Sequence, residues 1–198
     1  MKWLIFLLFS LTLTAKEPDP ITQVKQWCKE EKERTEGRFF KFASLATVSP
    51  TGTPHIRMIE IVHFHKEKGA LFFTHQNTRK VADITHTPLA ALNLWLPKTH
   101  RQLILEGSVE KIENLEAEKS WNRMPRYMKL SFLASHHAGA LDSIAVLEER
   151  KEALKKTYPK EIPCPQEFVG YRLVPNQITF YEVCPRFFPE KGSRRLER

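Results

Sequence analysis

Hydrophobic and polar positions alternate through the middle of the chain in short runs that predict β-strands. The runs end at turn-forming stretches, of which Ser49-Pro50-Thr51-Gly52-Thr53-Pro54 and Lys66-Glu67-Lys68-Gly69 are the clearest. The predicted strands cover residues 40–48, 55–64, 70–74, 89–95 and 101–112. Two more runs, at 169–174 and 177–183, are expected to form a hairpin around Pro175 and Asn176.

Apolar residues at helical spacing predict helices around these strands. Ile21, Val24 and Trp27 share one face of a helix at residues 21–36, which Gly37 ends. The remaining predicted helices cover residues 79–85, 115–122, 127–135 and 141–158. The last presents an apolar stripe that begins at Ile144 and that we expect to pack on the rest of the molecule.

Strands joined by tight turns pair antiparallel, so the fold class is α+β, mainly β with flanking helices. We expect the strands to close into a barrel. The two-residue period of a strand puts Arg57 on one face with Ile59 and Ile61. It puts Gln102 on a face with Ile104. Such polar residues mark either the rim of the barrel or a polar site in an apolar wall.

The chain has 198 residues, which suits one domain, and a net charge of +8, which favours anionic partners. Phosphorylated small molecules, nucleic acid and acidic membranes all qualify, but no nucleic-acid-binding signature is present, so no nucleic-acid partner is expected. The three cysteines have no metal-type spacing and are too few for a disulfide scaffold. His63 and His65 share a face without a third ligand at useful spacing, so no metal site is predicted.

Residues 1–15 resemble a secretory signal peptide, with Lys2, an apolar run and a small residue at Ala15. The run is too short for a stable membrane span. Leu13 is bulky where a small residue is preferred, and a buried N-terminal strand or helix is the alternative. We expect an exported or periplasmic protein if this leader is cleaved and a cytoplasmic one otherwise. Residues 16–198 then form the remaining domain.

Residues 71–80 combine the end of a strand, a polar turn and a helix that begins with Arg79 and Lys80. A helix start offers unpaired N–H groups and the positive end of the dipole, and the two side chains add full charge. This geometry suits a phosphate. An ordinary corner with solvated basic residues is the alternative.

Several motifs, in order along the chain, resemble the pyridoxamine 5′-phosphate oxidase family. They are Ala46-Thr47-Val48, Arg57-Met58-Ile59, Phe72-Phe73-Thr74, Thr78-Arg79-Lys80, Arg101-Gln102 and Gly170-Tyr171-Arg172. Together they cover nearly the whole chain after the leader, which makes them more specific than any one motif. The resemblance implies a six-stranded-type antiparallel split β-barrel that binds FMN, and a homodimer with two flavins at the subunit interface.

The cofactor-binding residues that the resemblance implies are Arg57, Met58, Ile59, Phe73, Thr74, Arg79, Lys80 and Gln102. The three cations among them would hold the flavin phosphate, and two or three cations suit a dianion. Phe73 and Thr74 would line the ribityl chain and the ring, and Gln102 would hydrogen-bond the isoalloxazine edge. Because the flavin itself takes the hydride in this chemistry, no catalytic acid or base is assigned.

The substrate half of the site departs from the family. A lysine that contacts flavin and substrate, and the Tyr, Arg and Ser that clamp the substrate phosphate, fall at Val62, Ser120, Met124 and Met128. A thioether carries no charge for a phosphate. One candidate for substrate binding is therefore Arg123, one residue before Met124. The other is Arg195, because the resemblance implies that Arg195-Leu196 stands for an Arg-Leu segment of the family, and a frayed basic tail is the alternative.

The resulting hypothesis is an FMN-dependent oxidoreductase of the pyridoxamine/pyridoxine 5′-phosphate oxidase type with altered substrate recognition, acting on a small, phosphorylated molecule. The alternative is a non-catalytic split-barrel protein that binds FMN or haem. A flavin reductase that uses NAD(P)H is a third hypothesis, which no Gly-rich dinucleotide turn supports.

Overall fold

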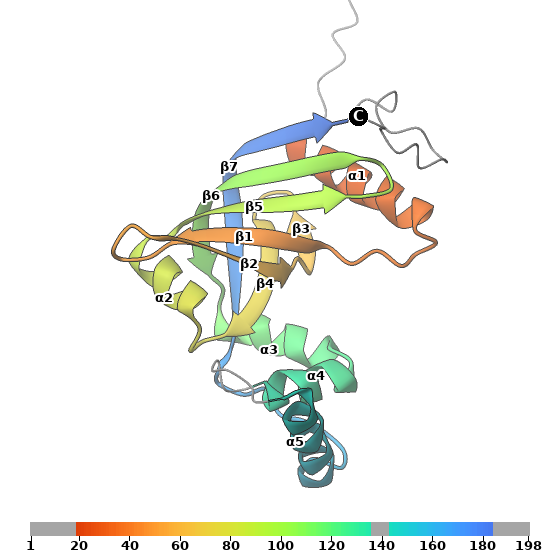
Figure 1. The fold of residues 1–198 in the computed structure, drawn as a ribbon, viewed down its shortest axis with the longest axis vertical. Helices are drawn as coiled ribbons and strands as arrows, with labels where there is room; N and C mark the ends of the chain where they lie inside the picture. The colour runs from red at the N-terminus through yellow and green to blue at the C-terminus, as the bar shows by residue number, and fades with distance from the viewer. Residues whose placement is uncertain (1–18, 136–142, 184–198) are drawn as a thin grey trace, which may run out of the picture.

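The computed structural model describes residues 19–135 and 143–183, which form one antiparallel sheet with helices around it (Figure 1). The strands are β1 (Phe42–Val48), β2 (Pro54–Glu60), β3 (His63–His65), β4 (Gly69–His75), β5 (Leu89–Leu96), β6 (Arg101–Lys111) and β7 (Phe168–Glu182). The helices are α1 (Pro20–Arg34), α2 (Arg79–His86), α3 (Asn114–Arg123), α4 (Arg126–Ala134) and α5 (Ile144–Thr157).

The strands follow the order β2-β1-β5-β6-β7-β4-β3, and every neighbouring pair is antiparallel. The two edge strands, β2 and β3, are consecutive in the chain. Between them the Ile61 N–H donates to the Lys41 carbonyl at 2.8 Å, and the next N–H, that of Val62, donates to the Leu71 carbonyl at 2.9 Å. The chain thus passes from β1 to β4 within two residues, and the two edges of the sheet meet. The predicted split barrel with flanking helices is confirmed.

The barrel interior is filled by inward-facing apolar side chains, among them Leu45, Phe72, Leu92, Leu103 and Leu173. Helix α1 covers one end, where Trp27 meets the edge of Phe180 at 5.1 Å between ring centroids. Glu31 of α1 is buried and accepts hydrogen bonds from the backbone N–H groups of Lys98 and Thr99 at 2.8 and 2.9 Å. This helix therefore also fixes the turn between β5 and β6.

Helices α3, α4 and α5 lie together beyond the other end of the barrel (Figure 1). Trp121 of α3 is fully buried and donates from Nε1 to the Ile162 carbonyl at 2.9 Å. The rings of Phe132 and Phe168 meet it edge-on, with centroids 5.5 and 4.9 Å away. This aromatic cluster attaches the helices to the ends of β4 and β7.

Two expectations about the strands need correction. The predicted strand at 55–64 is divided into β2 and β3 by the change of partner, and the sheet has seven strands where a six-stranded type was expected. The predicted hairpin is wrong, because β7 runs unbroken through Pro175. Pro175 lies opposite Gly107, where the register shifts as in a β-bulge. A proline, which cannot donate to a ladder, is tolerated at such a bulge.

No helix within residues 19–135 and 143–183 is both long enough and apolar enough to cross a membrane. The leader predicted at residues 1–15 lies outside the described residues.

Candidate functional site

The corner between β4 and α2 has the strand–turn–helix form predicted for it. β4 ends at His75 and α2 begins at Arg79. The N-cap residue, Thr78, makes no side-chain hydrogen bond to the helix start, and its hydroxyl donates instead to the His75 carbonyl at 3.0 Å. The first turn contains no acidic residue. The positive end of α2 is therefore not compensated by a side-chain cap, as suits an anion-binding site.

Arg57 reaches this corner from β2. Its guanidinium donates to the Leu45 carbonyl at 3.1 Å, to Thr47 Oγ1 at 2.7 Å and to Asp83 Oδ2 at 3.3 Å. These three acceptors come from β1 and α2, so they fix the guanidinium between the barrel wall and the helix. The pKa of Arg57 is lowered by burial, which the nearby carboxylate of Asp83 opposes and the charge of Arg79 reinforces.

Asp83 is buried on α2 and ties three residues to one carboxylate oxygen, Oδ2. Thr47 Oγ1 donates to it at 2.6 Å, and His55 Nδ1 lies 2.9 Å away and donates in the tautomer that carries its proton there. The third donor is Arg57. Burial alone would raise the pKa of Asp83, but the hydrogen bonds from Thr47 and His55 and the nearby positive charge outweigh it and lower the pKa.

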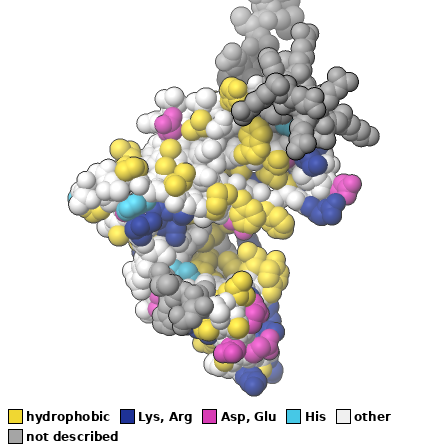
Figure 2. Space-filling view, viewed as in Figure 1, with side chains coloured by type: hydrophobic (Ala, Val, Ile, Leu, Met, Phe, Trp, Pro, Cys, Tyr) yellow, Lys and Arg dark blue, Asp and Glu magenta, His cyan; other side chains and the backbone are white. Residues whose placement is uncertain are grey.

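Lys80 completes the cluster from the first turn of α2. Its Nζ donates to Thr74 Oγ1 at 2.9 Å. The pKa of Lys80 is lowered by burial and by the charge of Arg57. The charge of Arg79 also lowers the pKa of Arg57, so both α2 cations lie close enough to Arg57 to repel it. Figure 2 shows Lys and Arg side chains gathered beside a His at the α2 side of the barrel. Three positive charges and the one negative charge of Asp83 leave a net charge of +2, which complements the charge of a phosphate dianion.

The other cofactor residues predicted from sequence lie in three different places. Phe73 lines a groove beside the cluster and stacks on Phe168 at 4.8 Å between centroids. Ile59 is in the barrel core at 8% exposure, so only its backbone could reach a ligand. Met58 and Gln102 lie on the outer face of the sheet, where Gln102 Nε2 donates to Asn93 Oδ1 at 2.9 Å. One chain alone thus does not bring Gln102 to the cations.

A groove runs between the barrel and helices α3 and α4, and it consists of two cavities of about 490 and 610 Å³. The larger cavity is lined by the positions at which the sequence departs from the family, Val62, Ser120, Met124 and Met128, and also by Arg123. Thr74, the partner of Lys80, lines the smaller one. The groove therefore begins at the cationic cluster. Arg195, the other candidate, lies outside the described residues.

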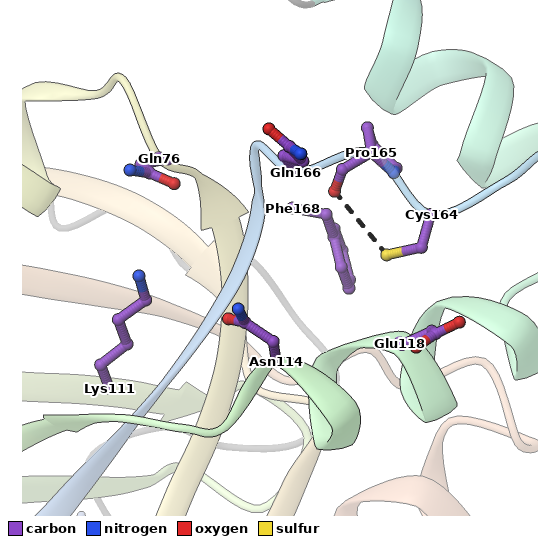
Figure 3. A pocket seen from close by; sticks show the side chains of 8 residues that line it. All are labelled: Gln76, Lys111, Asn114, Glu118, Cys164, Pro165, Gln166 and Phe168. Carbon is purple, nitrogen blue, oxygen red and sulfur yellow. Dashed lines mark hydrogen bonds between the residues drawn. The ribbon is translucent and has the colours of Figure 1, made fainter.

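A third cavity, of about 470 Å³, shares Phe168 with the groove (Figure 3). Figure 3 shows Gln76 and Lys111 on one side of it and Cys164 and Glu118 on the other. The Cys164 thiol donates to the Pro165 carbonyl at 3.7 Å. Lys111 is the only cation among the described lining residues, so this cavity lacks the converging charges of the α2 corner. Across the described residues, no group of His, Cys, Asp and Glu side chains could hold a metal ion.

Comparison with known proteins decides the family. A family model described as pyridoxamine 5′-phosphate oxidase matches residues 30–153, more than half of the chain. This chain belongs to the pyridoxamine 5′-phosphate oxidase family. The pyridoxine/pyridoxamine 5′-phosphate oxidase of a Cyanothece strain is 31% identical to it over 191 residues, which cover 95% of this chain and 88% of that protein. The protein of the same name from Microcystis aeruginosa is 34% identical, with 84% and 78% covered.

Two solved structures extend the comparison. PhzG from Burkholderia lata, determined in complex with tetrahydrophenazine-1-carboxylic acid, has a TM-score of 0.74 and 28% identity, covering 84% of this chain and 82% of its own. A pyridoxamine 5′-phosphate oxidase-related, FMN-binding protein from Nostoc punctiforme has a TM-score of 0.62 and 19% identity, with 81% and 84% covered. The second likeness shows the fold alone.

Membership of the pyridoxamine 5′-phosphate oxidase family does not reveal the residues that position the cations. Thr47, His55 and Asp83 were not among the predicted site residues, although Thr47 and Asp83 accept hydrogen bonds from Arg57 and His55 contacts Asp83. One signal was present in the sequence. Asp83 directly precedes Ile84 on the side of α2 that is buried, and an acidic residue on a buried face needs partners.

Proposed function

We propose that this chain binds FMN and acts as an FMN-dependent oxidoreductase, with the flavin phosphate at the α2 corner. The observation that carries the proposal is the cluster of Arg57, Arg79 and Lys80 around a helix start without a side-chain cap. Its net charge of two, counted with Asp83, complements a phosphate dianion.

The described side chains suit the separate tasks of holding such a cofactor. Asp83 and Thr47 orient the guanidinium of Arg57, and Thr74 orients the ammonium of Lys80. Phe73 offers an aromatic wall next to them, in the groove between the barrel and the helices. Bound FMN would supply the hydride-accepting chemistry, and the protein would supply position and polarity.

The proposal includes a homodimer. Gln102 and Arg57 lie on opposite faces of the sheet, so one chain cannot bring both to one flavin. A second copy packed on the outer face could supply its own Gln102. That face exposes large apolar side chains, namely Phe42 (52%), Ile56 (69%), Met58 (61%) and Trp95 (45%). Figure 2 shows hydrophobic side chains across it. Such a surface is typical of an interface.

The direct test is a titration of the purified protein with FMN and with riboflavin, which lacks the phosphate. We expect FMN to bind roughly 100-fold more tightly, since a charged phosphate meets two or three cations. Equal affinities would overturn the assignment of the phosphate site. Anaerobic bleaching of the bound flavin band by a substrate distinguishes an enzyme from a non-catalytic FMN-binding protein.

The substrate of the proposed enzyme is a small molecule. The two relatives described above carry the name of an oxidase for phosphorylated pyridines, whereas PhzG was solved with a carboxylic acid that has no phosphate group. Both classes are therefore candidates, and the residues that line the groove distinguish between them.

A further inference from the structure

The groove between the barrel and α3–α4 has a mainly apolar lining. Its two cavities share Glu60, Val62, Phe73, Met124 and Met128. Val62 exposes 49% of its surface and Tyr127, at the edge of the smaller cavity, 68%. A ligand that covers these side chains removes apolar surface from water. The groove is therefore suited to a flat apolar molecule.

Two carboxylates interrupt this lining. Glu116, which lines the larger cavity, forms an ion pair with Arg172. Glu60, at the end of β2, is half-buried and lines both cavities. Its side chain makes no hydrogen bond or ion pair with any other residue of the described ranges. A ligand that separates this carboxylate from water must offer it a hydrogen-bond donor, because an unsatisfied buried acceptor is costly.

The charges in the groove disfavour a second phosphate. Among the described residues, no Lys or Arg lines the smaller cavity. Lys119 and Arg123 line the larger one, but both are exposed to water, where they attract an anion only weakly. The lining that the two cavities share contains Glu60, Val62 and the two methionines but no cation, and a carboxylate repels a phosphate dianion.

We propose that the groove binds an unphosphorylated, planar nitrogen heterocycle whose N–H group donates to Glu60. This inference rests on the proposed function, because a flavin held at the α2 corner is what would act on such a ring. Phe73 presents an aromatic surface to the ring, and the thioethers of Met124 and Met128 adapt to flat apolar ligands. Glu60 fixes the orientation of the ring by accepting a hydrogen bond from the ring N–H.

The first experiment tests the preference against phosphate. Pyridoxamine and pyridoxamine 5′-phosphate differ only in that group, and their binding to the FMN-loaded protein is measured by ligand-observed NMR. We expect pyridoxamine to bind about tenfold more tightly, because of the charge of Glu60. The double variant Val62→Lys/Met124→Arg should reverse this preference. A wild-type protein that prefers the phosphate ester would overturn the proposal.

The second experiment tests the N–H contact. Carbazole and dibenzofuran have the same planar shape, but one carries an N–H and the other an ether oxygen. We expect carbazole to bind about tenfold more tightly, and Glu60→Met to abolish the difference. The control Glu67→Met, in the turn between β3 and β4, should keep it. Equal binding in the wild type, or a difference that survives Glu60→Met, contradicts the proposal.

Failure of this inference is separable from failure of the proposed function. FMN affinity is measured on the same samples, and the probes are also titrated against the flavin-free protein. Tight FMN binding without binding of any probe, as expected if a second copy of the chain fills the groove, overturns the inference and leaves the flavin assignment standing. Binding of the probes by a protein that does not bind FMN overturns the flavin assignment and leaves the groove as a binding site for the heterocycle.

Discussion

At the scale of single residues, the α2 corner depends on Asp83. Its one oxygen Oδ2 is shared by Thr47, His55 and Arg57, and the side chain is almost fully buried. We expect Asp83→Asn to lower the free energy of unfolding by about 3 kcal/mol, because it leaves the charge of Arg57 without its partner. Urea denaturation checks this value. The control Glu110→Gln, on the exposed face of β6, should change stability by less than about 0.5 kcal/mol.

The lowered pKa of Asp83 adds a prediction about acid. A carboxyl group with a lower pKa in the folded state than in the unfolded chain contributes stability above the unfolded value, about 3.9. That contribution is lost as the pH falls through the folded pKa. The stability difference between wild type and Asp83→Asn should therefore be constant near neutrality and shrink below about pH 4. A difference that is independent of pH down to acid unfolding would show that the ion pair is not its source.

Lys80 should impose an upper pH limit on FMN binding. Burial and the charge of Arg57 lower the pKa of Lys80. As the pH rises, its ammonium therefore loses the proton at a lower pH than free lysine, whose pKa is about 10.4. A neutral amine attracts a phosphate poorly. We expect FMN affinity to fall in this alkaline range and Lys80→Arg to extend tight binding to higher pH. Riboflavin is the control, since its affinity should not follow the same titration. A parallel loss for both ligands would point to the flavin ring.

The cations of this site could be predicted from the sequence, whereas their supports could not. Arg79 and Lys80 are adjacent and open a helix, so a local pattern suffices. Asp83 meets Thr47 and His55 across 36 and 28 positions of the chain, and no periodicity reports such a contact. Glu60 is similar, because its role depends on helices that follow it by more than fifty residues.

At the scale of elements, the β6–β7 pair contains a bulge where a turn was predicted. Pro-Asn is a strong local turn signal, but β7 continues and takes up Asn176 as an extra residue where its register shifts between Glu106 and Gly107. A Cβ on Gly107 would lie 2.1 Å from the Val174 carbonyl oxygen. We expect Gly107→Ala to cost about 3 kcal/mol, since backbone must move. Thermal unfolding measures this loss, and Ser108→Ala, at the next position of β6, is the control that should remain close to wild type.

Helix α5 shows a second limit of local patterns. Its apolar stripe was expected to pack, yet none of its residues is fully buried and Ile144 is 78% exposed. Leu154, further along, does pack against the Trp121 cluster. Periodicity identified the helix correctly. It could not show which part of the stripe meets another element, because that depends on where the helix lies relative to α4.

At the scale of the whole molecule, the barrel separates two surfaces that the proposed function needs together. The cations of the α2 corner and the groove lie at one end of the barrel, while Gln102 lies with the exposed apolar residues on the outer face of the sheet. The alternation of each strand could be predicted, and it placed Arg57 and Met58 on opposite sides. How two copies meet depends on the complete surface, which no single strand encodes.

A charge placed on this outer face should therefore disrupt both assembly and cofactor binding. We expect Met58→Glu and Ile56→Glu to convert a dimer into a monomer in analytical ultracentrifugation, because each buries a carboxylate in an apolar interface. FMN affinity should fall when the dimer is lost, since the monomer lacks the Gln102 of a second copy. Ile144→Glu adds the same charge at an exposed apolar position on α5, away from that face, and should leave both properties unchanged.

If the face variants remain dimeric, the interface lies elsewhere. If they become monomeric and still bind FMN tightly, Gln102 of a second chain is not part of the site.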